Sequence, residues 1–408
     1  MGGLGSVLQK EYDREILQHG EDAFLDIKLA RLTDAIIGAW TDWADDHKRP
    51  ALKRFRVIVE DFYVTPLAKL IVSLKSGQSL PTTSYPIVTF SDTQTLGIHT
   101  ISPDVMDRMA NIPVGLISMP AAYADFPVLW VALAHEICGH DVVRAFDQSS
   151  DGDSKLFLEL MASFDRISPT ITPGWEEVWK AWLEEAIADV YGLIVMGPMF
   201  AVGMAAWLST TNAASNALPT NKLGELTNFI WLNDGSISEH PPNLIRLHIL
   251  AGALKWLITD ESTRDSYIAT IDELIEGASG GQTHVAVIEG SAGEIAFRYP
   301  IEPLTADARI IGRHLASVRL PMLGCRCIAE LMPWDNTKEE NAREIARLFV
   351  TDAASWTPSD LSSFSSVYMM AGAFMAMTYD PRKLTVINER LMGALDKRYE
   401  FLLSEKGL

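Results

Sequence analysis

The residues best suited to chemistry lie in the segment 134–141, which reads Ala-His-Glu-Ile-Cys-Gly-His-Asp. This segment follows a strongly apolar run, where polar side chains are costly unless they are paired or bind a metal. His135 and His140 both fall within it. Because imidazole nitrogens are common zinc ligands, we expect the two histidines to bind a metal ion rather than to be ordinary core residues.

The spacing of these histidines differs from that of the common zinc-peptidase motif. That motif places its histidines four positions apart, where an α-helix brings them onto one face. His135 and His140 are five positions apart, which would splay them by about 140° on a regular α-helix. A π-bulge, a helical turn widened by one residue, would bring both imidazoles to one ion. We therefore predict such a bulge, with Gly139 supplying backbone freedom.

A third ligand is predicted in the acidic segment 184–189, on a helix expected from residue 175 to beyond 193. Glu185 and Asp189 are four positions apart and share one face of that helix. This spacing suits a carboxylate ligand together with a second carboxylate that orients a ligand histidine through its far ring nitrogen. Two histidines, one carboxylate and an open position are typical of a catalytic zinc site. The predicted cofactor is one Zn²⁺ per chain.

Further candidates would complete a hydrolytic site. Glu136 follows the first histidine and is predicted to take a proton from metal-bound water as the water attacks a carbonyl. Downstream, a His-Pro-Pro turn precedes a predicted helix. There, His240 could stabilise the oxyanion, and Arg246 could bind Asp189 or a substrate carboxylate. The alternative is a simple helix start in which His240 is solvated.

The two segments together resemble the motifs of the dipeptidyl peptidase III family of zincin metallopeptidases. Residues 135–140 are similar to that family's His-Glu-x-x-Gly-His motif, and residues 184–189 to its Glu-Glu-x-x-Ala-Glu or -Asp motif. The resemblance implies that Glu185 is the ligand and that Asp189 lies just outside the ligand sphere, as does Glu184. Members of that family are considerably longer than this chain, so the resemblance extends to a glutamate-ligand zincin rather than to dipeptide-releasing specificity.

Two other functions could use the same ligands. A non-haem iron enzyme also binds its metal through two histidines and one carboxylate. Such a site has no need of a carboxylate next to its first histidine, so Glu136 favours the peptidase. A zincin-shaped binding or regulatory protein without catalysis is the third alternative. The predicted partner of the peptidase is a peptide substrate.

The elements that must position these residues are mostly helical. Apolar residues recur at helical spacing over much of 7–75, again around the two motifs, and from 304 to the end. Runs typical of strands occur at 87–90, 96–101 and 114–119, and a hairpin is expected over 283–288 and 294–299. A long apolar helix should carry residues 127–141. Residues 115–122 could include an edge strand that pairs with an extended peptide, or a plain core strand.

These patterns predict a mainly α (α+β) fold. We expect a zincin-like core with a small β-sheet, and helical N- and C-terminal parts that form a two-lobed molecule. The expected divisions are an N-terminal helical lobe at 1–80, the catalytic core at 81–260 and a mostly helical C-terminal lobe at 261–408.

Composition restricts the partners and the compartment. Acidic residues outnumber basic ones by 53 to 34, which disfavours nucleic acid and anionic membranes. Three cysteines predict no disulfide framework, and the N-terminus lacks the pattern of an export signal, so a cytoplasmic protein is expected. The apolar stretch 186–208 contains Asp189, Gly197 and Pro198 and is predicted to be a buried helix rather than a membrane span.

Overall fold

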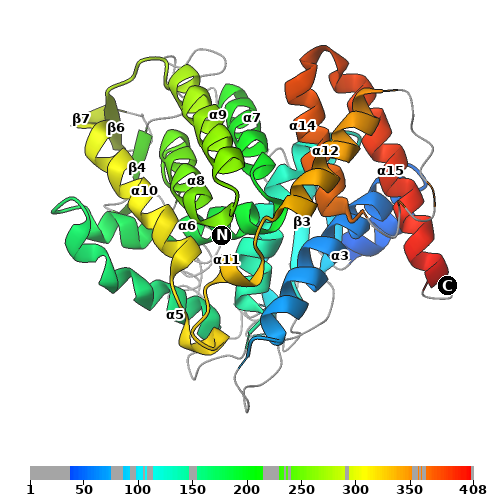
Figure 1. The fold of residues 1–408 in the computed structure, drawn as a ribbon, viewed down its shortest axis with the longest axis horizontal. Coiled ribbons are helices and arrows are strands. Elements are labelled where there is room, and N and C mark those ends of the chain that lie inside the picture. The colour runs from blue at the N-terminus through cyan, green and yellow to red at the C-terminus, as the bar shows by residue number, and fades with distance from the viewer. Residues whose placement is uncertain are drawn as a thin grey trace, which may run out of the picture.

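The computed structural model describes residues 37–74, 86–91, 98–103, 106–107, 114–146, 154–214, 229–233, 236–237, 240–289, 294–351, 357, 360 and 364–405. Most of these residues are helical, and two small sheets accompany the helices (Figure 1). The predicted mainly α class with a small β content is therefore confirmed. The predicted helices at residues 7–36 lie outside the described residues.

The first sheet has three strands, β1 (Ile87–Ser91), β2 (His99–Ile101) and β3 (Leu116–Pro120), in the order β1-β3-β2. They coincide with the three predicted runs. The central strand β3 pairs in parallel with β1 and antiparallel with β2. Of the two roles considered for residues 115–122, the core strand is confirmed and the edge strand is wrong, because both sides of β3 are already hydrogen-bonded.

The second sheet has the order β5-β4-β6-β7. Its strands β6 (His284–Glu289) and β7 (Glu294–Pro300) pair antiparallel and confirm the predicted hairpin. Strand β4 (Phe229–Asn233) pairs in parallel with β6 and antiparallel with the short β5 (Ser236–Ile237). The sheet lies at the side of the molecule, next to α10 (Ile301–Ser317) (Figure 1).

Three helical elements hold the candidate site. They are the π-helix η3 (Ala134–Val142) and the α-helices α6 (Glu176–Met196) and α8 (Asn243–Leu257), and the 3₁₀-helix η2 (Pro127–Val131) lies shortly before η3 in the chain. Helix α6 packs against both η3 and α8. Every residue of η3 is buried, as is nearly all of the second half of α6.

A glycine separates α6 from α7 (Met199–Ala214). Gly197 has φ of 79°, a value that side chains other than glycine rarely adopt. A Cβ atom at this position would also lie 2.4 Å from the ring of Trp334. The apolar stretch 186–208 thus forms two helices, whose described side chains are mostly buried. No helix in the described part of the chain is long and apolar enough to cross a membrane.

The remaining helices surround this centre. The α-helices are α3 (Arg49–Ile71), α5 (Lys155–Ser163), α9 (Glu261–Ser279), α11 (Ile328–Leu331), α12 (Asn336–Val350), α14 (Ser366–Tyr379) and α15 (Leu384–Glu405). Helix α3 packs on η3 and also on α14 and α15, so segments far apart in the sequence lie side by side (Figure 1). Helices α8 and α10 pack closely, and their buried side chains join those of η3 and α6 in one hydrophobic cluster.

Candidate metal centre

The two histidines of the first motif lie on a π-helix. Element η3 spans nine residues, Ala134–Val142, so the widened turn predicted from the spacing is confirmed and extends over more than one turn. The rings of His135 and His140 face the same region, with centroids 5.1 Å apart. Both residues are buried, being 5% and 2% exposed.

Gly139 permits this helix to approach α6. A Cβ atom at position 139 would lie 2.2 Å from the Cα atom of Ala188, which is far inside the contact distance. The glycine is therefore required for close contact between the two helices, whereas the sequence suggested only backbone freedom. This contact brings Glu185, one turn before Ala188, to the two histidines.

The three predicted ligands come together. One ligand atom from each of His135, His140 and Glu185 lies within 4.8 Å of the others, and all three residues are buried. Nε2 of His135 is 3.3 Å from one carboxylate oxygen of Glu185, and Nε2 of His140 is 3.7 Å from the other. Among the described residues, no other group of three metal-binding side chains is this compact.

The chemistry of these atoms fits a metal ion. Nε2 of His140 is buried and has no hydrogen-bond partner among the described residues. Buried polar atoms of this kind are rare in folded proteins unless a water or an ion satisfies them. Burial, the largest influence, lowers the pKa of His140 to about 4, so its ring is neutral at pH 7. A neutral imidazole has the lone pair that a metal needs.

His135 is held by a carboxylate that is itself held by an arginine. Nδ1 of His135 lies 2.9 Å from Oδ1 of Asp189. The guanidinium of Arg246 donates two hydrogen bonds to the same carboxylate, over 2.8 Å and 2.7 Å. Asp189 thus orients His135 as predicted, and of the two partners considered for Arg246 the structure selects Asp189. The remaining ring nitrogen, Nε2, faces Glu185.

His140 also has a carboxylate beside its Nδ1, although this pair does not have the geometry of a hydrogen bond. Its Nδ1 lies 3.3 Å from Oε1 of Glu184, which places Glu184 next to the ligands as predicted. Arg144 donates to the same oxygen over 3.1 Å and 2.8 Å and also lies over the ring of Phe157. Although burial would raise it, contacts with His140 and Arg144 lower the pKa of Glu184 to about 2, so this acid stays ionised. Sequence reasoning missed Arg144, although its position four residues after His140 on a helix was a usable signal.

The candidate base lies within the same buried region. Glu136 is 8% exposed, and burial is the main influence that raises its pKa to about 7. The charge of His135 acts in the opposite direction, and those of Glu185 and Arg246 are also close enough to be felt. A carboxylate with a pKa near 7 can both accept and return a proton at neutral pH.

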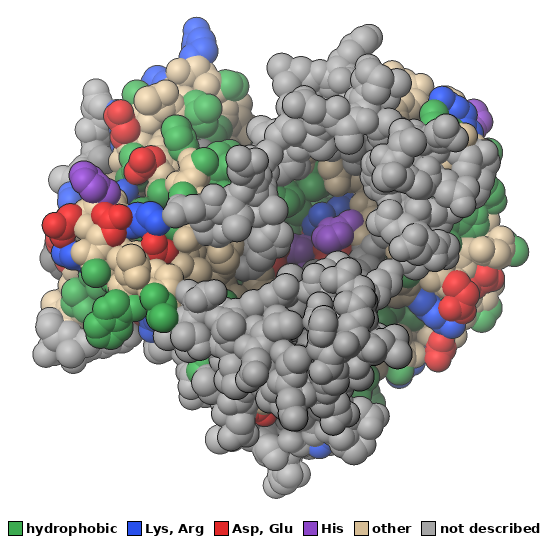
Figure 2. Space-filling model, turned by 180° about the vertical axis from the view of Figure 1, so that it is seen from behind, with side chains coloured by type: hydrophobic (Ala, Val, Ile, Leu, Met, Phe, Trp, Pro, Cys, Tyr) green, Lys and Arg blue, Asp and Glu red, His purple; other side chains and the backbone are tan. Residues whose placement is uncertain are grey.

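His240 occupies the exposed side of the centre. Its Nε2 lies 3.4 Å from Oε2 of Glu185, while 55% of its side chain is exposed. It directly precedes Pro241 and Pro242, the latter of which caps α8, so the predicted turn into a helix is confirmed. In Figure 2, which shows the face opposite to that of Figure 1, histidine and basic side chains are visible near the middle of the molecule.

All eight predicted site residues are therefore close together, drawn from η3, α6, α8 and the turn before α8. No family model, no curated protein and no solved structure matches the chain.

Proposed function

We propose that this protein is a zinc-dependent peptidase in which His135, His140 and Glu185 hold one zinc ion. The observation that carries the proposal is the compact group of these three side chains, with ligand atoms within 4.8 Å of one another. A proton acceptor, Glu136, follows the first ligand directly and has a pKa raised to about 7. Two histidines, one carboxylate and a nearby base are the set that hydrolytic zinc sites use.

Different residues of the chain would carry out different steps of the hydrolysis. A bound zinc ion would polarise the scissile carbonyl and lower the pKa of a bound water towards roughly 7. Glu136 takes the proton of that water and passes it to the leaving amine. His240, at the exposed side, donates a hydrogen bond to the oxyanion that forms as the carbonyl is attacked. Asp189 and Glu184 keep the ligand imidazoles in place.

The order of the elements supports the resemblance to zincins. A three-stranded sheet precedes the helix with the two histidines, and that helix packs against the later helix with the glutamate. The exposure of His240, 55% of whose side chain is accessible next to Glu185, supports the access of a peptide substrate to the centre.

Glu136 also separates the peptidase from the iron-enzyme alternative. Both would use the same three ligands. A buried acid with a raised pKa serves the transfer of protons during hydrolysis, and it has no role in an oxygenase triad. The peptidase therefore accounts for one more feature of the site than the iron enzyme does.

The test combines metal content with peptide turnover. Purified wild type, Glu136→Gln and the control Glu177→Gln would be analysed by elemental mass spectrometry and with a library of quenched fluorescent peptides. Glu177 is exposed on α6 and offers the same chemical change outside the site. We expect one zinc per chain in all three, and turnover reduced at least about 100-fold in Glu136→Gln alone.

Three results would contradict the proposal. Protein that binds no metal would remove its basis. Iron in place of zinc would favour an oxygenase, and zinc without turnover of any peptide in the library would favour a binding or regulatory protein.

A further inference from the structure

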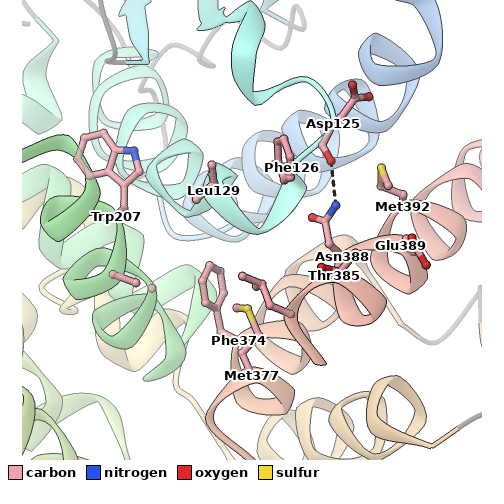
Figure 3. Close-up of a pocket in the computed structure, with 13 residues that line it drawn as sticks. Asp125, Phe126, Leu129, Trp207, Phe374, Met377, Thr385, Asn388, Glu389 and Met392 are labelled. Atoms are coloured by element: carbon pink, nitrogen blue, oxygen red, sulfur yellow. Dashed lines mark hydrogen bonds between the residues drawn. The ribbon is translucent and has the colours of Figure 1, made fainter. Parts of the chain in front are cut away.

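A separate cavity of about 510 Å³ is lined by none of the residues of the candidate metal centre. It is bounded by η2 and the residues just before it, by α7, and by α14 and α15 (Figure 3). Ligand sites in proteins commonly have volumes of about 300 to 1,000 Å³, whereas ordinary interiors contain few voids larger than a water molecule. The size of this cavity therefore fits a small organic molecule.

The walls of the cavity are mostly apolar. Leu129 of η2, Trp207 of α7, and Phe374 and Met377 of α14 all line it (Figure 3). Phe126, which directly precedes η2, also lines it and is 52% exposed. Such walls favour a molecule with an apolar body.

One polar group in the wall has an unmet hydrogen bond. Asn388 of α15 is only 6% exposed, and its Nδ2 donates to the backbone carbonyl of Asp125 over 2.8 Å (Figure 3). Since a carbonyl oxygen only accepts, this bond fixes which atom of the amide is the nitrogen. The other atom, Oδ1, is buried and has no partner among the described residues. Because Oδ1 has almost no accessible area, the amide must rotate slightly towards the cavity to be reached. A ligand that then donates a hydrogen bond to Oδ1 would remove this cost.

The charges of the lining residues restrict the head group of a ligand further. Asp125 and Glu389 are exposed residues that line the cavity, and the described lining residues include no lysine, arginine or histidine. A carboxylate group would be repelled by these acids and would leave Oδ1 of Asn388 without a donor. A hydroxyl group meets neither difficulty.

We propose that this cavity binds a small apolar molecule whose polar end is a hydrogen-bond donor, of the class of aliphatic alcohols, with the donor directed to Oδ1 of Asn388. The site shares no residue with the metal centre. Its existence therefore does not depend on the proposed peptidase activity, and each proposal can fail without the other.

The test uses the full chain as purified, with 1-octanol and octanoate as probes, measured by isothermal titration calorimetry and ligand-observed NMR. These probes have the same chain length and differ in their head groups. We expect saturable binding of 1-octanol and at least 10-fold weaker binding of octanoate. Equal affinity for the two, or no saturable binding of 1-octanol up to its solubility limit, would overturn the proposal.

Two variants test the location. Ala206 is an exposed residue of α7 that lines the cavity, so Ala206→Trp fills the space without disturbing the core. It should abolish binding, whereas Ala181→Trp, at an exposed position of α6 outside the lining, should retain it. Undiminished binding to Ala206→Trp would place the ligand elsewhere.

A third variant tests the recognition of the head group. Asn388→Leu keeps the approximate shape of the side chain and removes Oδ1, and it should weaken 1-octanol binding by about 3-fold to 10-fold. Melting temperature would be followed in parallel, because this change also removes the hydrogen bond to Asp125. A folded Asn388→Leu protein with wild-type affinity would show that Oδ1 does not recognise the ligand.

Discussion

Asp189 and His135 are joined by a 2.9 Å contact between Oδ1 and Nδ1, although they lie on different helices. Two hydrogen bonds from Arg246 hold the Asp189 carboxylate in place. The hydrogen bond to Nδ1 thus fixes the orientation of the imidazole, and its other nitrogen, Nε2, faces Glu185. A ligand held in this way loses little freedom when it binds a metal.

The first prediction concerns Asp189→Asn. The amide keeps the shape of the carboxylate and one acceptor oxygen, but it removes the charge that would strengthen His135 as a ligand in the proposed zinc site. We expect zinc affinity to fall by about 10-fold to 100-fold, measured by competition with a chromophoric chelator. Asp165→Asn, at an exposed position, is the control and should bind zinc like the wild type. Unchanged affinity in Asp189→Asn would mean that the carboxylate has only a packing role.

The second prediction concerns Gly139→Ala. The new methyl group would lie 2.2 Å from the Cα atom of Ala188, and because this neighbour is backbone the two helices must separate. We expect the free energy of unfolding to fall by about 1 to 3 kcal/mol or more, and zinc affinity to fall with it.

Gly277→Ala provides a matched control for this change. Gly277 lies within α9, and a Cβ atom there has nothing within 4 Å. Alanine should stabilise this helix by about 0.5 to 1 kcal/mol. Urea unfolding of both variants would measure the two effects. Equal stability of the two alanine variants would contradict the close approach of η3 and α6.

The third prediction concerns His240→Ala and rests on the proposed peptidase. Since His240 is largely exposed and lies beyond the three predicted ligands, the variant should keep its zinc. If His240 stabilises the oxyanion, turnover should fall by about 10² to 10³. His284→Ala, at an exposed position of β6, is the control. Loss of zinc from His240→Ala would instead make this histidine a metal ligand.

The fourth prediction concerns the pH dependence of stability. His248 of α8 accepts a hydrogen bond from Arg309, and burial together with that positive charge lowers the pKa of His248 to about 4. The unfolded chain takes up this proton near pH 6.5, whereas the folded chain does not. The contribution of neutral His248 to the free energy of unfolding is therefore fully present above about pH 6.5, and it is lost as the pH falls towards 4.

His248→Gln would test this linkage. Glutamine can still accept from Arg309 but cannot be protonated, so the variant should lose less stability than the wild type between pH 7 and pH 5. The difference should be on the order of 2 kcal/mol, since each unit of pKa shift corresponds to about 1.4 kcal/mol. Urea unfolding of the metal-free proteins at both pH values would measure it. Identical losses in the two proteins would show that His248 protonates freely in the folded state.

Much of the candidate metal centre could be predicted, because the spacings that define it lie within two short segments of the sequence. A five-residue separation of His135 and His140 demands a widened helix, and the π-helix is present. A four-residue separation of Glu185 and Asp189 places both on one helix face, and both meet His135 there.

The parts that could not be predicted depend on contacts between distant segments. The role of Gly139 is set by Ala188 on another helix, and that of Arg144 by Glu184 across the same helix pair. The position of β3 in the middle of its sheet depends on pairing with both β1 and β2, which no local pattern encodes. Likewise, the sequence allowed either Asp189 or a substrate carboxylate as the partner of Arg246, and only the structure shows that Arg246 donates to Asp189.

The charged groups in and next to the centre have a further consequence. They are four carboxylates and two guanidinium groups, from Glu136, Glu184, Glu185, Asp189, Arg144 and Arg246. Although burial would lower it, hydrogen bonds with Asp189 and Glu185 raise the pKa of His135 to about 9 in the absence of a metal. With a metal bound to both imidazoles, and with all four acids ionised, the net charge of the six groups would be −2. A doubly charged cation would bring the region to electrical neutrality, whereas a monovalent or trivalent one would leave charge uncompensated away from water. The charge balance therefore favours a divalent cation. The ligand types, two imidazoles and one carboxylate, favour the same kind of ion.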